Sequence, residues 1–495
     1  MSTRSIPSDR LRGIIAAALL VAGFAALYAF TAQRGLSWGD SGVYQYRMMT
    51  GDLPGPYGLA TAHPSYIFLG RLLSGLVGGT ARFWAMNAMS GLFMALAIGG
   101  FFCCAVRYCR SVHAAALAAM TLGCAHMAWW LSCLAEVYTL SLCLLAAETA
   151  CLLHLLRTEN MRGFLLLALL NGLHFSVHNF ALLALPVYGA IFVWRVSRCR
   201  PPLPRLLATA VGSATLWLLG AAPLLALAVR HYRLGHGLQD TVVSVLLDHF
   251  GAQVSGLHGV SATITAFNFA LAALSFMLPC WLAPILRLRT RQPPLLHRPP
   301  FSRETAALLA LFGIHFLFWV RYRVADQATF ILPTLFFAAL FLSRALVGIR
   351  RPVAWGVATA ACAVLVPILA ARGLNAFAPS SVRPPLPFRN DWNYFAIPWK
   401  NTETSAAKFA EAAIRELPPG AFVYTDCNDI GPLACTRQAE LFPGDIWFSL
   451  PWANLREPPA TTSSRWEVRP FGAYRIAPPE ATIVKRKTFY EVKLP

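Results

Sequence analysis

Four short polar stretches interrupt an otherwise apolar chain, and their side chains are of the types that carry acid–base and phosphate chemistry. They are WGDSG at 38–42 with HP at 63–64, AEVYTL at 135–140, NGLHFSVHN at 171–179 and RYRVAD at 321–326. A carboxylate can accept a proton, and an arginine presents a permanently charged fork to phosphate oxygens. Charged groups inside a membrane body are costly, so each is a functional candidate by default. The candidates are Asp40, His63, Glu136, Tyr138, His178, Asn179, Arg321, Arg323 and Asp326.

These candidates also have structural interpretations. Asp40 follows a glycine, so it can be a turn or cap residue as well as a general base. Glu136 stands where a helix begins, a place where the helix dipole favours a carboxylate. His174 and His178 share a helix face, which suits a metal site, although a hydrogen-bonded interior histidine is the commoner case. No spacing matches a defined metal motif, so no metal ligand is assigned.

The remaining charges allow similar alternatives. Arg321 and Arg323 can bind a phosphate, or they can form an interfacial ion cluster with Asp326. Glu148 lies about three turns deeper than Glu136 along the same predicted helix. We expect its side chain to face the interior of the helix bundle, opposite a partner that the sequence does not name.

Composition indicates that the chain lies in a membrane. Of its 495 residues, 57% are hydrophobic and 13% are charged, whereas a soluble domain carries roughly 25% charged residues. Ten of the 22 acidic residues lie in residues 1–375 and twelve in 376–495, and all five lysines lie after residue 399. The net charge of +20 comes mainly from arginines between apolar runs. We interpret them as topology signals, and no nucleic acid is expected as a partner.

Eleven apolar runs approach the roughly 20 residues that a helix needs to cross a bilayer. With the N-terminus inside, the short inner loops hold 19 arginines and the outer loops hold eight, which fits the excess of positive charge in cytoplasmic loops. Eleven spans then put the C-terminus outside, and all four polar stretches fall on the outer side. Residues 64–80 are predicted to lie along the outer face. The runs are 14–32, 83–106, 113–133, 136–156, 163–178, 180–195, 206–229, 262–286, 305–320, 328–347 and 352–371.

This pattern predicts an all-α polytopic membrane protein with about eleven transmembrane helices and a small C-terminal extracytoplasmic α/β domain. We expect a transmembrane domain over residues 1–371, a Pro-rich linker over 372–401 and the α/β domain over 402–495. Within that last domain, Thr402 is expected to cap a helix over 403–416, and AFVYT at 421–425 is typical of a strand. Cys427 and Cys435 also lie there, and the sequence leaves open whether they form a disulfide.

Taken in order, WGDSGVYQYR, HPSYIFLGRL, AEVYTL, NGLHFSVHN and YRVADQATFILP resemble segments of one family of polytopic membrane proteins. That family contains the animal transmembrane protein O-mannosyltransferases and bacterial relatives, and it belongs to the GT-C superfamily of glycosyltransferases. The resemblance covers about residues 10–345 and extends weakly to LPPGAFVYTDCNDIGPL in the tail. Members often have an acid after DSG and a second proline after HP, where this chain has Val43 and Ser65.

The resemblance implies a sugar donor carried on a polyprenyl phosphate and an acidic base in the first outer loop, which here is Asp40. Transfer is expected to invert the anomeric centre, on the extracytoplasmic side. Glu136 would position the acceptor, hold a metal or orient Tyr138. Arg321 and Arg323 would bind the phosphate of the sugar donor, and His63 or His178 would add a hydrogen-bond donor to it. The residues expected to position the substrate are Tyr138, Asn179 and Asp326.

The expected partners are the polyprenyl-phosphate sugar, membrane lipid, and an acceptor protein or glycan. No cofactor is assigned, and a requirement for a divalent cation stays open. The arginine-rich, lysine-poor body suggests a bacterial inner membrane, with the N-terminus cytoplasmic and the C-terminal domain periplasmic. Two other functions compete: a flippase or transporter of lipid-linked glycans, and a binding protein that acts through its tail. A transporter is expected to contain paired repeats with broken helices, and we find no second copy of the DSG or AEVYTL segment.

Overall fold

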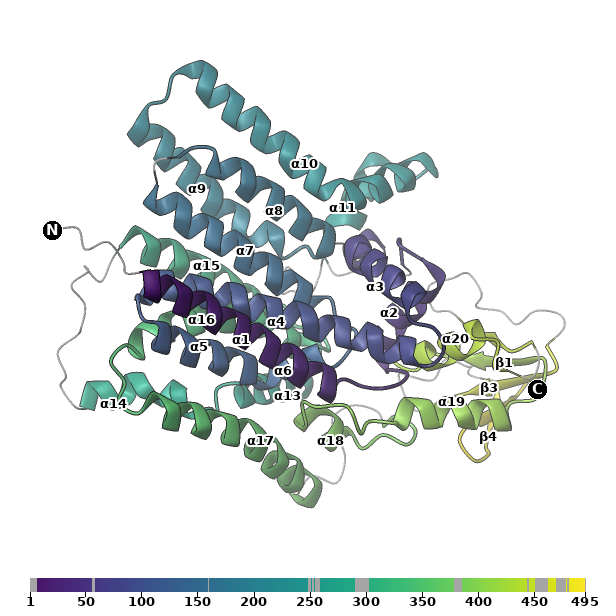
Figure 1. Cartoon of the computed structure of the whole chain (residues 1–495). Coiled ribbons are helices and arrows are strands. Elements are labelled where there is room, and N and C mark those ends of the chain that lie inside the picture. Colours follow the sequence, from purple (N-terminus) through teal and green to yellow (C-terminus); the bar gives the residue numbers. More distant parts are fainter. Residues whose placement is uncertain are drawn as a thin grey trace.

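The computed structural model describes residues 7–55, 58–158, 160–247, 251, 253, 259–289, 302–377, 385–442, 445–449, 462–468, 478 and 480–494. Each of the eleven predicted apolar runs is helical there. The helices of this body run side by side in Figure 1. They are α1 (Pro7–Thr31), α4 (Ala81–Cys109), α5 (Val112–Cys124), α6 (His126–Ser132), α7 (Tyr138–Arg157), α8 (Gly163–Val177), α9 (Ala181–Cys199), α10 (Leu203–Arg233), α13 (Ala262–Leu274), η3 (Pro279–Leu282), α14 (Ala283–Arg289), α15 (Arg303–Arg321), η4 (Gln327–Ile331), α16 (Leu332–Ala345) and α17 (Pro352–Phe377).

Eight helices of the described chain are long and apolar enough to cross a membrane, or up to ten if each of two bent pairs counts as one span. The bent pairs are α5 with α6, at 63°, and α13 with the helical turns over Pro279–Leu286, at 89°. In addition, α8 is a shorter apolar helix. The chain is therefore an integral membrane protein, and the predicted fold class is confirmed.

Burial separates the central helices from the peripheral ones. The apolar windows of α4, α7 and the helix that ends in α16 are 67%, 61% and 78% buried, whereas those of α10 and α17 are only 22% buried. Large apolar side chains such as Leu19, Val211 and Leu369 are exposed on the peripheral helices. Such an apolar surface would be unfavourable in water, but it is suited to contact with the hydrocarbon core of a bilayer.

Shorter elements gather at one end of the helical body. They are α2 (Gly39–Thr50), η1 (Leu59–Thr61), α3 (Pro64–Leu76), α11 (Leu238–Leu246) and α18 (Asp391–Ala396). Figure 1 shows α2, α3 and α11 at the end that faces the strands, while α1 begins at the opposite end. The helix predicted over 64–80 is present as α3. It stops at Leu76, shortly before the run Gly78-Gly79.

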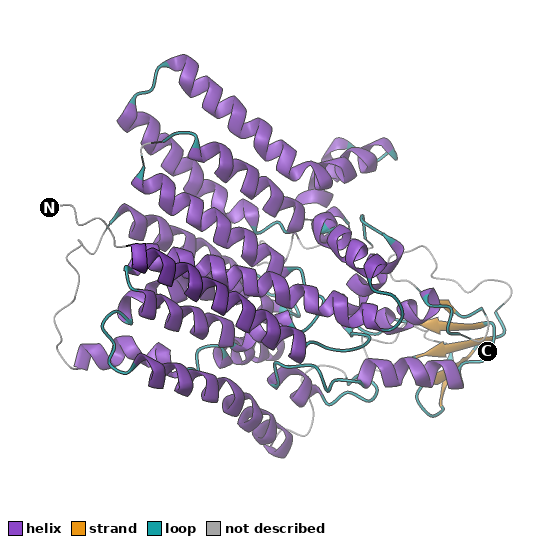
Figure 2. Cartoon of the chain, in the orientation of Figure 1, coloured by secondary structure: helices purple, strands orange, loops and turns teal. Residues whose placement is uncertain are grey.

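The C-terminal region is a small mixed α/β unit. The five strands among its described residues have the order β2-β1-β3-β5-β4, and Figure 2 shows that they are confined to this end of the molecule. The strand β1 pairs in parallel with β2 and β3, with Phe422 opposite Trp447 and Arg465, whereas β5 is antiparallel to β3 and β4. The elements are α19 (Ser405–Glu416), β1 (Ala421–Tyr424), α20 (Ile430–Gln438), β2 (Trp447–Phe448), β3 (Ser464–Glu467), β4 (Thr482–Lys485) and β5 (Tyr490–Lys493).

Details of this unit depart from the predictions. The strand AFVYT is present as β1, but the capping role predicted for Thr402 is wrong, because α19 begins at Ser405 and its N-cap residue is Thr404. Cys427 is exposed, Cys435 is buried, and both are free thiols. Residues 378–384 of the predicted linker lie outside the described residues.

The α/β unit is tied to the end of α1 and the start of α2. Backbone amides of Gly39 and Lys400 donate to the carbonyls of Asn428 and Thr31, at 3.0 and 2.8 Å. Helices α2 and α20 pack so closely that a Cβ on Gly431 would lie 2.7 Å from the backbone of Gly42. The absence of side chains at both positions permits this approach, which fixes the start of α2 against the C-terminal unit.

Candidate active site

A cavity of about 410 Å³ lies where α2, the start of α3, the junction of α8 with α9 and the segment before η4 meet. Apolar side chains form much of the remaining wall, among them Leu183, Leu247, Phe318 and Phe330. The cavity thus offers acid–base groups beside an apolar surface. Six of the nine side chains predicted from the sequence line it, namely Asp40, His63, Tyr138, His178, Asn179 and Asp326.

Asp40 stands in the first turn of α2, where the helix dipole favours a carboxylate. The backbone enters that turn through Gly39, whose φ of 58° suits glycine. The preceding residue, Trp38, is buried, and its Nε1 donates to the Ser405 hydroxyl at 2.7 Å. Asp40 is itself exposed at the cavity. The C-terminal unit therefore holds the carboxylate in place from behind while leaving it accessible.

Two histidines stack beside this carboxylate, and their hydrogen bonds assign them opposite roles. The rings of His63 and His178 lie 5.2 Å apart and nearly parallel. His63 Nδ1 donates to the Val177 carbonyl at 2.7 Å, so its Nε2 is an acceptor. His178 Nδ1 accepts from the Phe180 amide at 3.1 Å, so its Nε2 carries the proton. In this arrangement His178 can donate to an anion, whereas His63 cannot without gaining a proton.

Burial keeps both imidazoles neutral. Loss of solvation and, to a smaller extent, the neighbouring Arg47 together lower the pKa of His63 to about 3. Loss of solvation also lowers the pKa of His178 well below its ordinary range, with His63 and His174 acting in the same direction. A neutral pair adds no positive charge to the cavity, so any attraction of an anion by His178 is that of a hydrogen-bond donor.

Glu136 lies behind the cavity wall rather than among its lining residues. It is 7% exposed, and its carboxylate accepts from the Ser41 hydroxyl at 2.5 Å. Its backbone amide donates to Ser90 at 2.9 Å. Burial raises the pKa of Glu136 well above its ordinary range, and Asp40 and Asp326 raise it further. The direction of this shift follows because a charged Glu136 would be a third negative charge close to those two carboxylates.

Asp326 and Tyr138 form a pair across the cavity. The Tyr138 hydroxyl donates to Asp326 Oδ2 at 3.2 Å, and its ring packs edge-on against Phe330 at 5.3 Å. Asn179 Nδ2 donates to the Val245 carbonyl at 3.0 Å, which ties the segment at the end of α11 to the cavity wall. These contacts connect three separate parts of the chain around one space.

Arg321 and Arg323 are both exposed and do not line this cavity, although Tyr322 between them does. The carbonyl of Arg323 accepts from the Val260 amide at 3.2 Å. The two arginines therefore lie next to the cavity and not within it. Their predicted contact with a phosphate would require their side chains to turn towards the opening.

Arg47 is a further functional candidate. From the sequence it was only one of the eight arginines assigned to the outer loops. It is 1% exposed, and its guanidinium donates to the carbonyls of Asp52, Leu53, Thr61 and Ala62. It also lies 5.9 Å from the Tyr44 ring centroid. A usable signal was present, because Asp40, Tyr44 and Arg47 have the i, i+4, i+7 spacing of one helix face.

The expected orientation of Glu148 towards the bundle interior is found. Glu148 is fully buried and accepts from the Tyr188 hydroxyl at 2.7 Å and from His174 Nδ1 at 2.8 Å. His174 Nε2 in turn lies 2.6 Å from the Ser141 hydroxyl. The hydrogen-bonded alternative for His174 therefore holds. Within the described residues, no group of three or more His, Cys, Asp or Glu side chains is placed to hold a metal ion.

Parts of this chain and its fold are similar to known proteins. Residues 57–200 match the family described as the Protein O-mannosyl-transferase TMEM260 N-terminal domain. ArnT from Cupriavidus metallidurans, solved with undecaprenyl phosphate, has a similar structure at 16% identity and a TM-score of 0.62, covering 96% of this chain and 97% of that one. The same protein in its apo state gives 15% identity and a TM-score of 0.56 with the same coverage. No curated protein matches the chain.

This chain has the GT-C fold. The resemblance stated from its sequence is confirmed, since the matched range contains HPSYIFLGRL, AEVYTL and NGLHFSVHN. The GT-C matches support glycosyl transfer at a membrane as the class of activity. WGDSG and RYRVAD lie outside the matched range, so the roles of Asp40, Arg321, Arg323 and Asp326 depend on the geometry described above.

Proposed function

We propose that the chain is an inverting glycosyltransferase that moves a sugar from a polyprenyl-phosphate donor to an acceptor on the extracytoplasmic side of the membrane. The observation that carries this proposal is the cavity in which Asp40 and Asp326 face an apolar wall. A lipid-linked sugar has the same division, with a polar headgroup and an apolar chain. ArnT, which shares the fold, was solved bound to undecaprenyl phosphate, and this supports the same class of donor here.

In this mechanism Asp40 is the general base. Its carboxylate takes the proton of the acceptor hydroxyl as that oxygen forms a bond to the anomeric carbon. The bond from the anomeric carbon to the phosphate oxygen breaks on the opposite side, and polyprenyl phosphate leaves with the negative charge. Attack opposite the leaving group inverts the anomeric centre, through an oxocarbenium-like state.

The remaining candidates would bind and orient the substrates. His178 Nε2–H would donate to the leaving phosphate, and the exposed side chains of Arg321 and Arg323 would turn inwards to neutralise it. His63 stacks on His178 and fixes its plane. Asp326 would receive an acceptor or sugar hydroxyl, since its Oδ2 already accepts from Tyr138.

Two of the predicted residues act indirectly in this proposal, without contacting the reacting atoms. Asn179 would shape the wall of the cavity through its bond to the Val245 carbonyl. Glu136 would hold Ser41, and with it the first turn of α2, instead of reacting. The three-part division into residues 1–371, 372–401 and 402–495 would then correspond to a catalytic membrane domain, a linker and a domain that anchors Asp40 from behind.

We also propose that the N-terminus is cytoplasmic and that the C-terminal domain is outside, in the periplasm of a bacterial inner membrane. The arginine excess of the inner loops supports this orientation. It agrees with the arrangement in which α1 begins at the end of the body far from the strands. The cavity, at the strand end, would then meet donors and acceptors on the outer surface.

The test is transfer from a polyprenyl-phosphate sugar in reconstituted vesicles, measured for the wild type and for Asp40→Asn. We expect turnover to fall by about 10² to 10⁴, the usual contribution of a general base. The matched control is Asp240→Asn, because Asp240 is also an exposed acid in the first turn of a helix but does not line the cavity. Equal turnover in both variants would remove Asp40 from this role. Scrambling of the donor between leaflets without transfer would favour a flippase instead.

A further inference from the structure

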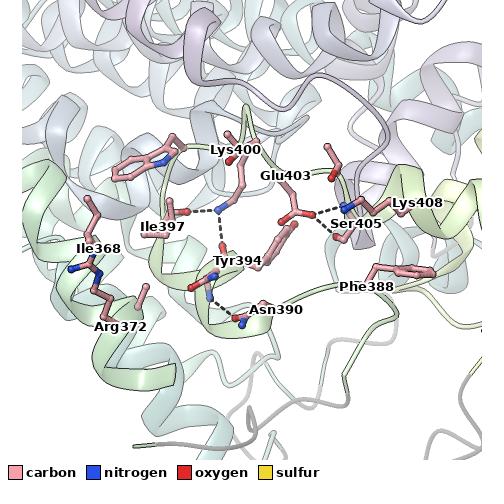
Figure 3. A pocket seen from close by; sticks show the side chains of 15 residues that line it. Ile368, Arg372, Phe388, Asn390, Tyr394, Ile397, Lys400, Glu403, Ser405 and Lys408 are labelled. Atoms are coloured by element: carbon pink, nitrogen blue, oxygen red, sulfur yellow. Dashed lines mark hydrogen bonds between the residues drawn. The ribbon is translucent and has the colours of Figure 1, made fainter. Parts of the chain in front are cut away.

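A second pocket, of about 520 Å³, is lined in part by the segment that leads into the C-terminal unit. Its walls come from the last part of α17, from residues 388–400 and from the first turn of α19. Figure 3 shows side chains from these three parts of the chain pointing into one space. None of the residues that line the first cavity lines this one.

The floor of the pocket is built around a buried lysine. Lys400 is 1% exposed, and its Nζ donates to the Tyr394 carbonyl at 2.6 Å and to the Ile397 carbonyl. Its ammonium also lies 4.9 Å from the Tyr394 ring centroid and 5.6 Å from that of Trp130. Burial lowers the pKa of Lys400 to about 7. A buried charge with these partners organises the loop and is not an incidental feature of the surface.

The rim of the pocket combines cations with an aromatic ring. Arg372 and Lys408 both line it and are exposed. Phe388 is 54% exposed and has a φ of 61°, a left-handed conformation that a bulky side chain rarely adopts. Such a backbone conformation persists only where its surroundings enforce it, and it is commonest at binding sites. Here it presents an apolar ring to water at the mouth of a polar pocket.

This set of side chains fits an anionic carbohydrate. An aromatic face accepts the apolar side of a sugar ring, and Asn390, Asn393 and Thr402 offer amide and hydroxyl groups to sugar hydroxyls. Arg372 and Lys408 provide the positive charge for a phosphate or carboxylate. Among the described residues of the lining, Glu403 is the one acid and stands against three basic side chains, those of Arg372, Lys400 and Lys408.

Hydrogen bonds through Ser405 connect the pocket to the segment that carries the proposed catalytic carboxylate. Glu403 accepts from the Ser405 amide at 2.7 Å and from its hydroxyl. The same Ser405 oxygen accepts from Trp38 Nε1 at 2.7 Å. Trp38 is the N-cap residue of α2, and Asp40 stands in the first turn of that helix. A ligand that forms a hydrogen bond with Glu403 would therefore change the contacts that hold Asp40 in place.

We propose that this pocket is a second binding site, for an anionic carbohydrate, and that its occupancy is transmitted through Ser405 and Trp38 to the segment that carries Asp40. The binding itself is independent of the proposed catalytic function, and only its consequence for transfer rests on that function. The ligand is either the phosphorylated headgroup of a membrane glycolipid or a soluble sugar phosphate. The position beside α17, a candidate membrane span, allows a lipid headgroup to reach it.

Binding is tested with the full chain in phosphatidylcholine nanodiscs, by calorimetric titration with glucose 1-phosphate, glucose and inorganic phosphate. A parallel arm uses nanodiscs that contain phosphatidylinositol 4-phosphate and measures whether glucose 1-phosphate binding is competed away. We expect saturable binding of glucose 1-phosphate, weaker binding of the two fragments, and competition if the headgroup is the stronger ligand. A lack of competition would assign the site to the soluble source.

Variants locate the binding. We expect Arg372→Ala and Phe388→Ala each to weaken binding of glucose 1-phosphate about tenfold, as loss of a charged hydrogen bond or a stacked ring would. Arg415→Ala is the control, because Arg415 is also an exposed arginine but does not line the pocket. The conservative changes Arg372→Lys and Phe388→Tyr should retain most of the affinity, which guards against misfolding as the cause. Absence of saturable binding, or equal affinity in all variants, would overturn the site.

The connection to Asp40 is tested by hydrogen exchange, a measurement that does not require turnover. In the wild type, glucose 1-phosphate should alter the exchange of amides over residues 38–45. In Trp38→Phe binding should persist, because Trp38 does not line the pocket, but this effect should be lost because the hydrogen bond to Ser405 is removed. An unchanged exchange rate in the wild type, or the same effect in Trp38→Phe, would refute the connection. Loss of transfer in Asp40→Asn would leave these binding results unaffected.

Discussion

Replacement of Arg47 by lysine tests whether a single buried guanidinium holds the loop that frames the cavity. Arg47 donates from Nε to the Asp52 carbonyl at 3.0 Å and from Nη2 to the Leu53 carbonyl at 2.8 Å. It also reaches Thr61, at 3.3 Å, and Ala62, at 2.5 Å, on the far side of the loop. Lysine keeps the charge but places its donors at one atom, so it cannot span the same carbonyls.

The expected cost follows from the number of carbonyls that lose their donor. If one or two of the four become unpaired while buried, at about 1–3 kcal/mol each, Arg47→Lys should destabilise the protein by about 1–6 kcal/mol. Arg47→Ala should cost more, because it leaves all four without a donor. Thr61 lines the cavity, so we also expect weaker donor binding, seen as a raised KM.

The assay is thermal unfolding of the full chain in detergent, followed by intrinsic fluorescence. Arg34→Lys is the matched control, because Arg34 lies in the loop just before α2 but is exposed. A substitution of this type at the surface usually changes stability by no more than about 0.5 kcal/mol. If Arg47→Lys unfolded at the same temperature as the wild type and this control, the assignment of Arg47 as the anchor of the loop would be refuted.

Three further outcomes are expected. Because the pKa of Glu136 is raised in the folded protein, its contribution to stability is full at acid pH and is lost as pH rises through that pKa; Glu136→Gln should therefore unfold at a higher temperature than the wild type in alkaline buffer, but not in acid. The pKa of Lys400 is lowered to about 7, so the wild type should gain stability between pH 7 and 10.5 relative to Lys400→Met, in the same unfolding assay. Glu148→Gln should lower the free energy of unfolding by about 1–3 kcal/mol, because it disturbs the buried hydrogen bonds from His174 and Tyr188, and chemical denaturation can measure this loss.

Much of the fold could be predicted because a membrane imposes simple rules on sequence. The apolar runs had to be helical, since a spanning helix pairs its backbone groups internally. The short helix α2 could not be foreseen in this way, because it has mixed polarity and lies outside those runs. The start of α19 was misplaced for a local reason. The Glu403 side chain accepts from the amide of Ser405, the first residue of α19, so the helix begins two residues later than the predicted start at residue 403.

The site was predictable only as a set of groups on the same side of the membrane. Topology placed Asp40, His63, His178 and Asp326 on the outer side, and the cavity brings these four together. Topology could not tell that Glu136 would lie behind the wall, bonded to Ser41. Such distinctions depend on side-chain packing across segments far apart in the chain, which no local pattern encodes.

The charge of the cavity limits how a donor can bind under the proposed mechanism. Two carboxylates, Asp40 and Asp326, face it, and among its described lining residues there is no lysine or arginine. A phosphate that entered alone would add negative charge to a poorly solvated space that already holds two such charges. Arg321 and Arg323 flank Tyr322, which does line the cavity, so their inward rotation would bring two cations to the opening with little movement of the backbone. Binding of the sugar donor and this rotation should therefore occur together. The loop that carries these arginines should then affect the affinity of the enzyme for the donor more than the rate of the transfer step.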